Sequence, residues 1–133
     1  MATTLTKQSR EYRDVDFSFV SHPETNNILV KTKANAVKQS VINLLTLRPG
    51  DKPFHPEIKS PIYNYLFDNF SILEKIVLEG EIRNYLANYE PRLEVKTVTV
   101  TQSNYNDLNC EITGAIVNLS EPFTVNILID RLR

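Results

Sequence analysis

The stretch Leu86-Ala-Asn-Tyr-Glu-Pro-Arg-Leu-Glu-Val-Lys-Thr-Val-Thr-Val100 decides how this chain is organised. Apolar residues recur at helical spacing before it, whereas Val and Thr crowd together after it, as they do in strands. Pro91 disfavours helical geometry at Glu90, so we expect a helix to end near Tyr89. Glu90 and Arg92 are then expected to be exposed at a rigid corner, where they either contact a partner or form a local ion pair that only ends the helix.

A first helix is predicted over residues 34–47. Its apolar residues recur at steps of three and four and therefore share one face: Ala34, Val37, Val41, Leu44 and Leu45. Thr32 is the expected N-cap, and Pro49-Gly50 ends the helix. The following loop, residues 48–61, contains four prolines, which make it stiff, and we expect Phe54 and Ile58 to anchor it to the core.

A second long helix is predicted to begin at Ile72, because Ser71 and Glu74 have the spacing of a capping box. A short helix precedes it, with Ile62, Leu66 and Phe67 pointing inward. Gly80 lies inside the long helix at a cost of about 1 kcal/mol relative to Ala, which predicts tight packing against another element. The expected buried stripe consists of Leu73, Ile76, Val77, Ile82, Tyr85, Leu86 and Tyr89.

Three strands with short loops follow at 93–101, 108–118 and 123–131, which predicts an antiparallel meander. The alternation slips around Lys96-Thr97, which indicates either a bulge or a strand buried on both faces. Short strands near 15–19 and 28–30 predict a small hairpin. The expected fold class is α+β, with helices packed on one face of an antiparallel sheet, and either the final strand or the first lies at a sheet edge, open to another chain. We expect a flexible arm at 1–13 and one domain at 14–133.

Composition excludes several classes of protein. The 15 basic and 16 acidic residues nearly cancel, so charge gives no support for nucleic-acid binding. A single cysteine excludes an internal disulfide and a thiolate zinc site, and it fits a reducing compartment. The N-terminus lacks the apolar core of a signal peptide, and no apolar run approaches the ~20 residues that a membrane span needs. We therefore expect a soluble protein made in a cytosol.

No catalytic, metal-binding or cofactor-binding pattern is present, so the sequence predicts a protein that is not an enzyme. Each histidine, His22 and His55, precedes a proline in a loop without a ligand at metal spacing. Cys110 is expected to be a small buried side chain in a strand. A glycosidase needs two carboxylates across a cleft, and spacing alone leaves a cell-wall hydrolase open as the alternative, with candidates Glu57, Asp68, Glu74 and Glu90.

Several segments together resemble one family, the small baseplate-wedge proteins of contractile phage tails, also called lysozyme-like baseplate proteins. This family has relatives in type VI secretion systems and contractile bacteriocins. The matching segments follow one another in the family's order: Ala36-Val-Lys-Gln-Ser-Val-Ile-Asn-Leu-Leu45, Arg48-Pro-Gly-Asp-Lys-Pro-Phe-His-Pro-Glu57, Leu66-Phe-Asp-Asn69 and Ile82-Arg-Asn-Tyr-Leu-Ala-Asn-Tyr-Glu-Pro-Arg92. The last holds the family's Glu-Pro-Arg signature. Asp51 replaces a frequent Glu, and Lys59-Ser60 stands where a Gly is common.

The resemblance implies a structural role as sheath initiator in the virion tail baseplate, assembled in the bacterial host cytoplasm. It implies that Glu90, Pro91 and Arg92 dock on the core-bundle proteins of the wedge, and that inner baseplate or tube proteins lie nearby. It also implies that the tail sheath protein pairs with the strands of the meander. For the sheath contact we expect an edge strand carrying Phe123, Val125, Ile127 and Ile129. Neither nucleic acid nor a membrane is an expected partner.

Overall fold

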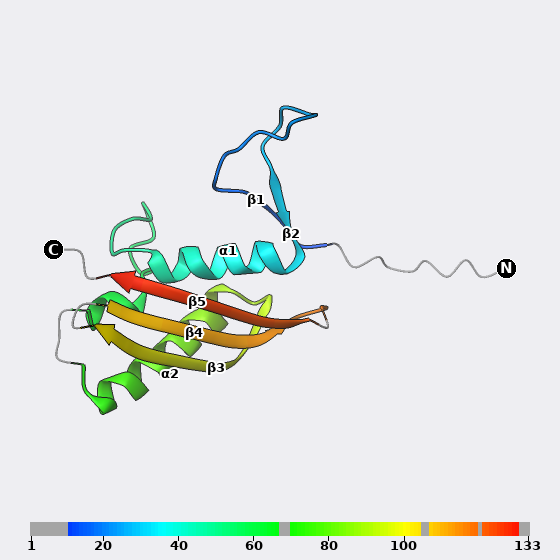
Figure 1. Cartoon of the computed structure of the whole chain (residues 1–133). Coiled ribbons are helices and arrows are strands. Elements are labelled where there is room, and N and C mark those ends of the chain that lie inside the picture. Colours follow the sequence, from blue (N-terminus) through cyan, green and yellow to red (C-terminus); the bar gives the residue numbers. More distant parts are fainter. Residues whose placement is uncertain (1–10, 67–69, 105–106, 120, 131–133) are drawn as a thin grey trace.

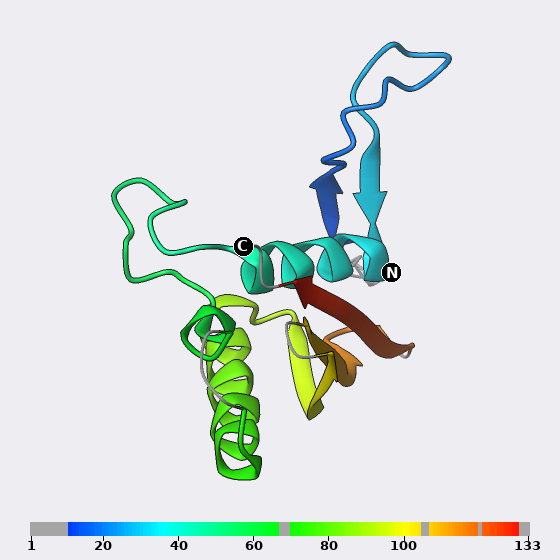
Figure 2. The same cartoon turned by 60° about the vertical axis from the view of Figure 1, so that its left-hand side comes forward.

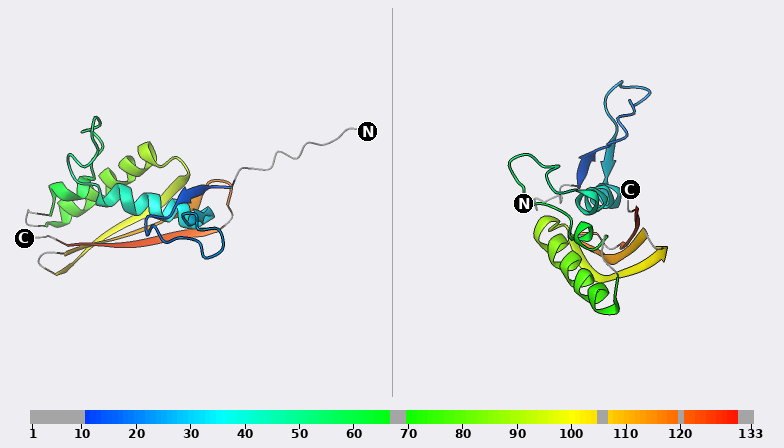
Figure 3. Two further views of the ribbon diagram at one scale, coloured as in Figure 1. Left: turned by 90° about the horizontal axis from the view of Figure 1, so that it is seen from above. Right: turned by 90° about the vertical axis from the view of Figure 1, so that its left-hand side faces the viewer.

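The computed structural model describes residues 11–66, 70–104, 107–119 and 121–130, and it has the predicted α+β class. One antiparallel sheet has the strand order β3-β4-β5, formed by β3 (Leu93–Asn104), β4 (Asp107–Ile116) and β5 (Pro122–Asp130). The helices α1 (Lys33–Thr46) and α2 (Ile72–Tyr89) lie on one side of this sheet (Figures 1 and 3). No described helix combines the length and the apolar composition that crossing a membrane requires.

The core lies between the sheet and the two helices. Side chains along β4 and β5 alternate between buried and more exposed positions, so each strand turns one apolar face toward the helices. The buried side chains form one cluster, which includes Val37, Val41, Leu45, Leu78, Ile82, Leu86, Val98, Val100, Leu108, Cys110 and Ile112. The opposite face of the sheet has no covering layer among the described residues (Figure 3).

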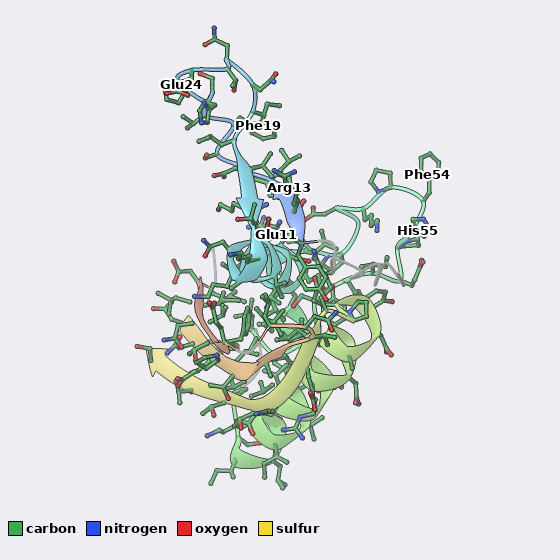
Figure 4. All side chains as sticks on the ribbon, turned by 90° about the vertical axis from the view of Figure 1, so that its right-hand side faces the viewer. Glu11, Arg13, Phe19, Glu24, Phe54 and His55 are labelled. Carbon is green, nitrogen blue, oxygen red and sulfur yellow. The ribbon has the colours of Figure 1, made fainter. Side chains whose placement is uncertain are left out.

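The predicted N-terminal hairpin is present, but it forms a separate two-stranded sheet of β1 (Arg13–Val15) and β2 (Val30–Thr32). It projects from the α1 side of the molecule (Figure 2). Its base is held by the Gln39 amide, whose Nε2 donates to the Val15 carbonyl at 2.6 Å. Phe17 and Phe19 are exposed, so the prediction that they belong to a half-buried strand is wrong. Figure 4 shows Phe19 on the projecting hairpin.

The first 13 residues were predicted to be one flexible arm. Residues 1–10 lie outside the described part of the chain. The end of the segment belongs to the folded body instead, because Arg13 is in β1 and the Tyr12 hydroxyl donates to the Val117 carbonyl at 3.0 Å.

The helix boundaries agree closely with the sequence. Ser71 and Glu74 form the predicted capping box: Glu74 N donates to Ser71 Oγ at 3.3 Å, and Ser71 N donates to Glu74 Oε2 at 2.6 Å. The apolar face of α1 is buried as predicted at Val37, Val41 and Leu45. Thr32 occupies the N-cap position of α1, but its side chain makes no cap hydrogen bond, so that part of the prediction is wrong.

The buried face of α2 was predicted only in part. Ile82, Tyr85 and Leu86 are buried as expected, together with Leu78, but the predicted members Leu73, Ile76, Val77 and Tyr89 are exposed. A Cβ added at Gly80 would meet no atom within 4 Å, so the expected tight packing there is also wrong within this chain. The helix is apolar on two sides, and periodicity alone does not choose which side faces the sheet.

The proline-rich loop does not use Phe54 as an anchor. Phe54 is 97% exposed and has φ +67°, and its side chain points away from the body (Figure 4). Ile58 is half-buried. A short 3-10 helix, η1 (Pro61–Asn64), follows and buries Ile62 as predicted. Leu66 is buried as well, whereas Phe67 lies outside the described residues.

The slip in the first strand of the meander is a bulge. The register of β3 against β4 shifts between Val95 and Thr97, where the alternation of the sequence breaks. Gly114 on β4 lies so close to the bulged strand that an added Cβ would collide with the carbonyl oxygen of Glu94. The bulge and this glycine together let the two backbones approach where β3 leaves the corner.

Candidate docking surfaces

The corner between α2 and β3 is built from backbone hydrogen bonds. Glu90 is the C-cap residue of α2, and its N–H donates to the Leu86 carbonyl at 2.8 Å. Its own carbonyl accepts from Leu93 N at 3.2 Å, so the chain turns within three residues. Pro91 is exposed at the apex of this turn. The structure therefore confirms the predicted end of the helix and the start of the strand.

Glu90 is not exposed, and this is a correction to the sequence prediction. Its side chain is only 2% exposed, and it accepts two hydrogen bonds from the Arg92 guanidinium, at 2.6 Å from Nε and 2.9 Å from Nη2. The Ser40 hydroxyl donates to the same carboxylate. Glu90 thereby joins α2 to α1, and no local pattern in the sequence indicates this contact, because Ser40 is 50 residues away.

The electrostatics of the pair favour its charged form. Burial disfavours the Glu90 carboxylate, but hydrogen bonds from Arg92 and Ser40 and the charge of Arg92 outweigh it, so the pKa of Glu90 lies below its ordinary value. The hydrogen bonds to Glu90 raise the pKa of Arg92. Two parallel N–H···O bonds fix the guanidinium plane as well as its position.

Arg92 extends the network to the N-terminal segment. Its guanidinium carbon lies 5.7 Å from the centre of the Tyr12 ring, within the range of a cation–π contact. Its carbonyl accepts from Val117 N at 2.9 Å, and the Val117 carbonyl accepts from the Tyr12 hydroxyl. The Arg92 side chain is 27% exposed. The corner therefore combines an internal clamp with an outer surface formed by Pro91 and part of Arg92.

The second candidate surface is the edge strand β5. Phe123, Val125, Ile127 and Ile129 are all buried against the helices, so these predicted contact residues belong to the core. The alternate side chains, Thr124, Asn126, Leu128 and Asp130, face outward. Among the described residues, no loop or side chain donates or accepts a hydrogen bond along the outer edge of β5, and no strand pairs there, although α1 lies alongside this strand (Figure 1).

At the opposite edge of the sheet, side chains of α2 occupy main-chain groups of β3. The Arg83 guanidinium donates to the Lys96 carbonyl at 3.3 Å, and Val100 N donates to Glu79 Oε1 at 3.0 Å. Together with the bulge, these contacts from α2 occupy main-chain groups that an added strand would need. Within the described residues, β5 is therefore the edge of this sheet that has neither a bulge nor a side-chain hydrogen bond to its outer main-chain groups.

The residues considered for chemistry do not come together. His55 Nδ1 lies 3.0 Å from Glu57 Oε1 on the exposed loop. Among the described residues, no group of three or more His, Cys, Asp or Glu side chains could hold a metal ion. Cys110 is fully buried, and burial, with a smaller effect of the Glu79 charge, raises the pKa of its thiol to about 12. It has the environment of a core residue, not that of a nucleophile.

Comparison with protein families gives a match over most of the chain. A family model described as "Baseplate wedge protein gp25" matches residues 31–119. The baseplate wedge protein gp25 of Enterobacteria phage T4 is 34% identical over 65 residues. That alignment covers 49% of this chain and 49% of the phage T4 protein, so the chain aligns with about half of this relative.

Two solved structures share the fold. A chain of the anti-feeding prophage baseplate has a TM-score of 0.69 at 19% identity, covering 84% of this chain and 90% of its own. A protein from Geobacter sulfurreducens, described as a tail lysozyme, has a TM-score of 0.65 at 18% identity, covering 73% and 89%. At these identities the likeness concerns the fold alone.

Proposed function

The chain belongs to the baseplate wedge protein gp25 family, and from this premise we propose that it is a non-enzymatic structural component of a contractile tail or tail-like injection machine. It docks on the core-bundle proteins of the wedge at the Glu90–Pro91–Arg92 corner. It starts sheath assembly by pairing β5 with a strand of the sheath protein. It is assembled in the cytoplasm of the bacterial host and lies near the inner baseplate and tube.

The open edge of β5 carries this proposal. β5 is nine residues long and pairs with β4 without a register shift, so its outer edge presents a regular row of main-chain groups. Such an edge is a template for an added strand, and natural proteins usually block it with bulges or charges. β3 is bulged and its main chain takes hydrogen bonds from α2 side chains, whereas β5 packs against α1 without a bulge and without such hydrogen bonds among the described residues. This asymmetry supports β5 as the pairing strand.

At the corner, the burial of Glu90 divides the roles of the three residues. Pro91 and the exposed part of Arg92 form the contact surface, and Glu90 holds Arg92 in a fixed orientation. A guanidinium held in place loses less conformational entropy when it binds. The ion pair is therefore structural, and in our proposal it also serves the docking.

The alternative of a cell-wall hydrolase is motivated by the description of the Geobacter sulfurreducens relative. A glycosidase acid needs a raised pKa. The candidate carboxylates Glu57, Glu74 and Glu90 have lowered pKa values, because backbone hydrogen bonds act on the first two and the Arg92 and Ser40 hydrogen bonds outweigh burial at the third. The fourth candidate, Asp68, lies outside the described residues. These environments support the structural role. Turnover of peptidoglycan by the purified chain above a buffer blank would revive the alternative.

The sheath-pairing proposal is tested with lysines on the outward positions of β5. The triple variant Thr124→Lys, Asn126→Lys and Leu128→Lys adds charge beside the open edge without touching the core. We expect particles carrying it to lack sheath, or to carry sheath that is detached from the baseplate, when viewed by electron microscopy. Deleting the strand is a poorer experiment, since it removes four buried side chains.

A matched control exists on β3. The central strand β4 has three residues that pair with the three mutated β5 positions: Thr113, Glu111 and Asn109. On the other side of β4, the same three residues pair with Thr97, Thr99 and Thr101 of β3. Three lysines there add the same charge next to the same neighbours. We expect normal sheath on these particles. Normal sheath on the β5 variant, or equal loss from both, would contradict the proposal.

A further inference from the structure

The outward face of α2 carries apolar side chains that none of the described residues covers. Ile72 and Leu73 are 79% and 75% exposed, and Ile76 and Val77 are also largely exposed. At about 100° per residue, one row of neighbouring positions runs along the solvent side of the helix. This row, here called the α2 stripe, consists of Leu73, Ile76, Val77, Gly80, Asn84 and Ala87.

The α2 stripe tapers along the helix. Its first half is bulky, whereas its second half is small, and an open hollow of about 620 Å³ adjoins that small half. Ala87 and Pro91 both line the hollow, so it connects the α2 stripe with the corner. Gly80 lies in the middle, and a Cβ added there would meet no described atom within 4 Å outside its own stretch of helix. A glycine there lets another backbone approach closely.

The flanks of the α2 stripe carry opposite charges. Glu81 lies on one side and Arg83 on the other; both are exposed, and Arg83 also donates to the Lys96 carbonyl of β3. Apolar residues at helical spacing with charged flanks are the pattern by which two helices pack and choose their orientation. A partner helix with basic residues on one edge and acidic residues on the other would satisfy both flanks.

A second copy of this chain does not fit. In an antiparallel pair the bulky half of one α2 stripe meets the small half of the other. Like charges then lie next to each other, Glu81 beside Glu81 and Arg83 beside Arg83, and they repel. In a parallel pair the charges match, but bulky meets bulky and the two hollows stay empty. The charge pattern and the taper together therefore favour a different helix.

We propose that the α2 stripe binds an amphipathic helix of a baseplate wedge protein. The bound helix places small residues over Leu73 and Val77, and large ones over Gly80 and into the hollow beside Ala87. This inference rests on the proposed function, which it deepens by naming the kind of element that docks next to the corner. It gives Gly80 a role that the described part of the chain does not supply.

The test uses Gly80→Leu. A Cβ added at Gly80 meets none of the other described atoms within 4 Å, and leucine is a better helix former than glycine, so the variant should melt at a higher temperature than wild type. The tagged full-length chain is co-expressed with the wedge proteins encoded beside it, and the retained wedge protein is quantified. We expect at least a tenfold loss of retention for Gly80→Leu, and a similar loss for Val77→Gln.

Two controls on α1 match these changes. Asn43→Leu places the same leucine side chain at an exposed helical position, and Ile42→Gln removes an exposed apolar side chain. Both should retain wedge protein as wild type does. Retention by Gly80→Leu equal to wild type would overturn the inference while leaving corner docking intact. If the wild-type chain retains no wedge protein, both the α2-stripe inference and the proposed docking at the corner fail. A wild-type dimer abolished by Gly80→Leu would assign the stripe to a second copy.

Discussion

Replacing Glu90 with glutamine should lower the free energy of unfolding by about 2–3 kcal/mol. Glu90 accepts two hydrogen bonds from Arg92 and one from Ser40, in a side chain that is 2% exposed. Hydrogen bonds to charged groups contribute about 1.5–3 kcal/mol each. Glutamine keeps one acceptor oxygen, and the partly exposed Arg92 regains some hydration. The expected loss is therefore smaller than the about 3–5 kcal/mol that removing one partner of a fully buried ion pair costs.

Urea unfolding followed by circular dichroism measures this difference. With a slope of about 1–3 kcal/mol per molar urea, the midpoint should fall by roughly 1 M or more. Glu94→Gln is the control, because Glu94 is an exposed carboxylate on β3, and its effect should stay within about 0.5 kcal/mol. A midpoint for Glu90→Gln within error of the control would show that the buried pair does not stabilise the fold.

The stability difference between wild type and Glu90→Gln should depend on pH. The pKa of Glu90 is lowered in the folded state, so its stabilisation is complete above the unfolded value of about 4.3 and is lost as the pH falls through the folded pKa. The stability difference between wild type and Glu90→Gln should therefore be constant from pH 7 to 5 and shrink in more acidic solution. A difference that does not change with pH would refute the argument.

Three further predictions concern the rest of the fold. Gly114→Ala should destabilise by about 1–3 kcal/mol in urea unfolding, because the new Cβ collides with the Glu94 carbonyl; an unchanged midpoint would mean that the strands separate easily. Ser71→Ala should cost about 1 kcal/mol through loss of the N-cap, and a cost near zero would contradict the capping box. Cys110 should react with a thiol reagent only when the protein unfolds, and rapid labelling of the native protein would contradict its burial.

Local signals predicted the elements, and long-range contacts decided the rest. The capping box at Ser71 and the broken alternation near Thr97 each depend on neighbouring residues, so both could be recognised in the sequence. The face of α2 could not, because Leu73 and Leu78 are equally apolar and the sheet selects only one of them. The burial of Glu90 depends on Ser40, on another helix, which sequence spacing does not reveal.

The edge strands show the same limit. Alternation predicted which side chains of β5 form one face, but it did not predict that this face is the core. Which edge of the sheet stays open depends on contacts from α2 to β3, made by Arg83 and Glu79 across the fold. The sequence could therefore predict a meander with two edges, and the structure shows which edge is blocked.

The most direct test of the account is a disulfide scan of the two edges in assembled particles. Asn126→Cys on β5 and Thr99→Cys on β3 both lie opposite Glu111, so they mark the two edges at the same level of the sheet. Paired strands bring opposite Cβ atoms to about 4.5–5.5 Å, which permits a disulfide with a cysteine scanned along the sheath protein. We predict cross-links to the sheath from Asn126→Cys and none from Thr99→Cys. Sheathed particles in which Asn126→Cys never cross-links, or in which Thr99→Cys does, would contradict it.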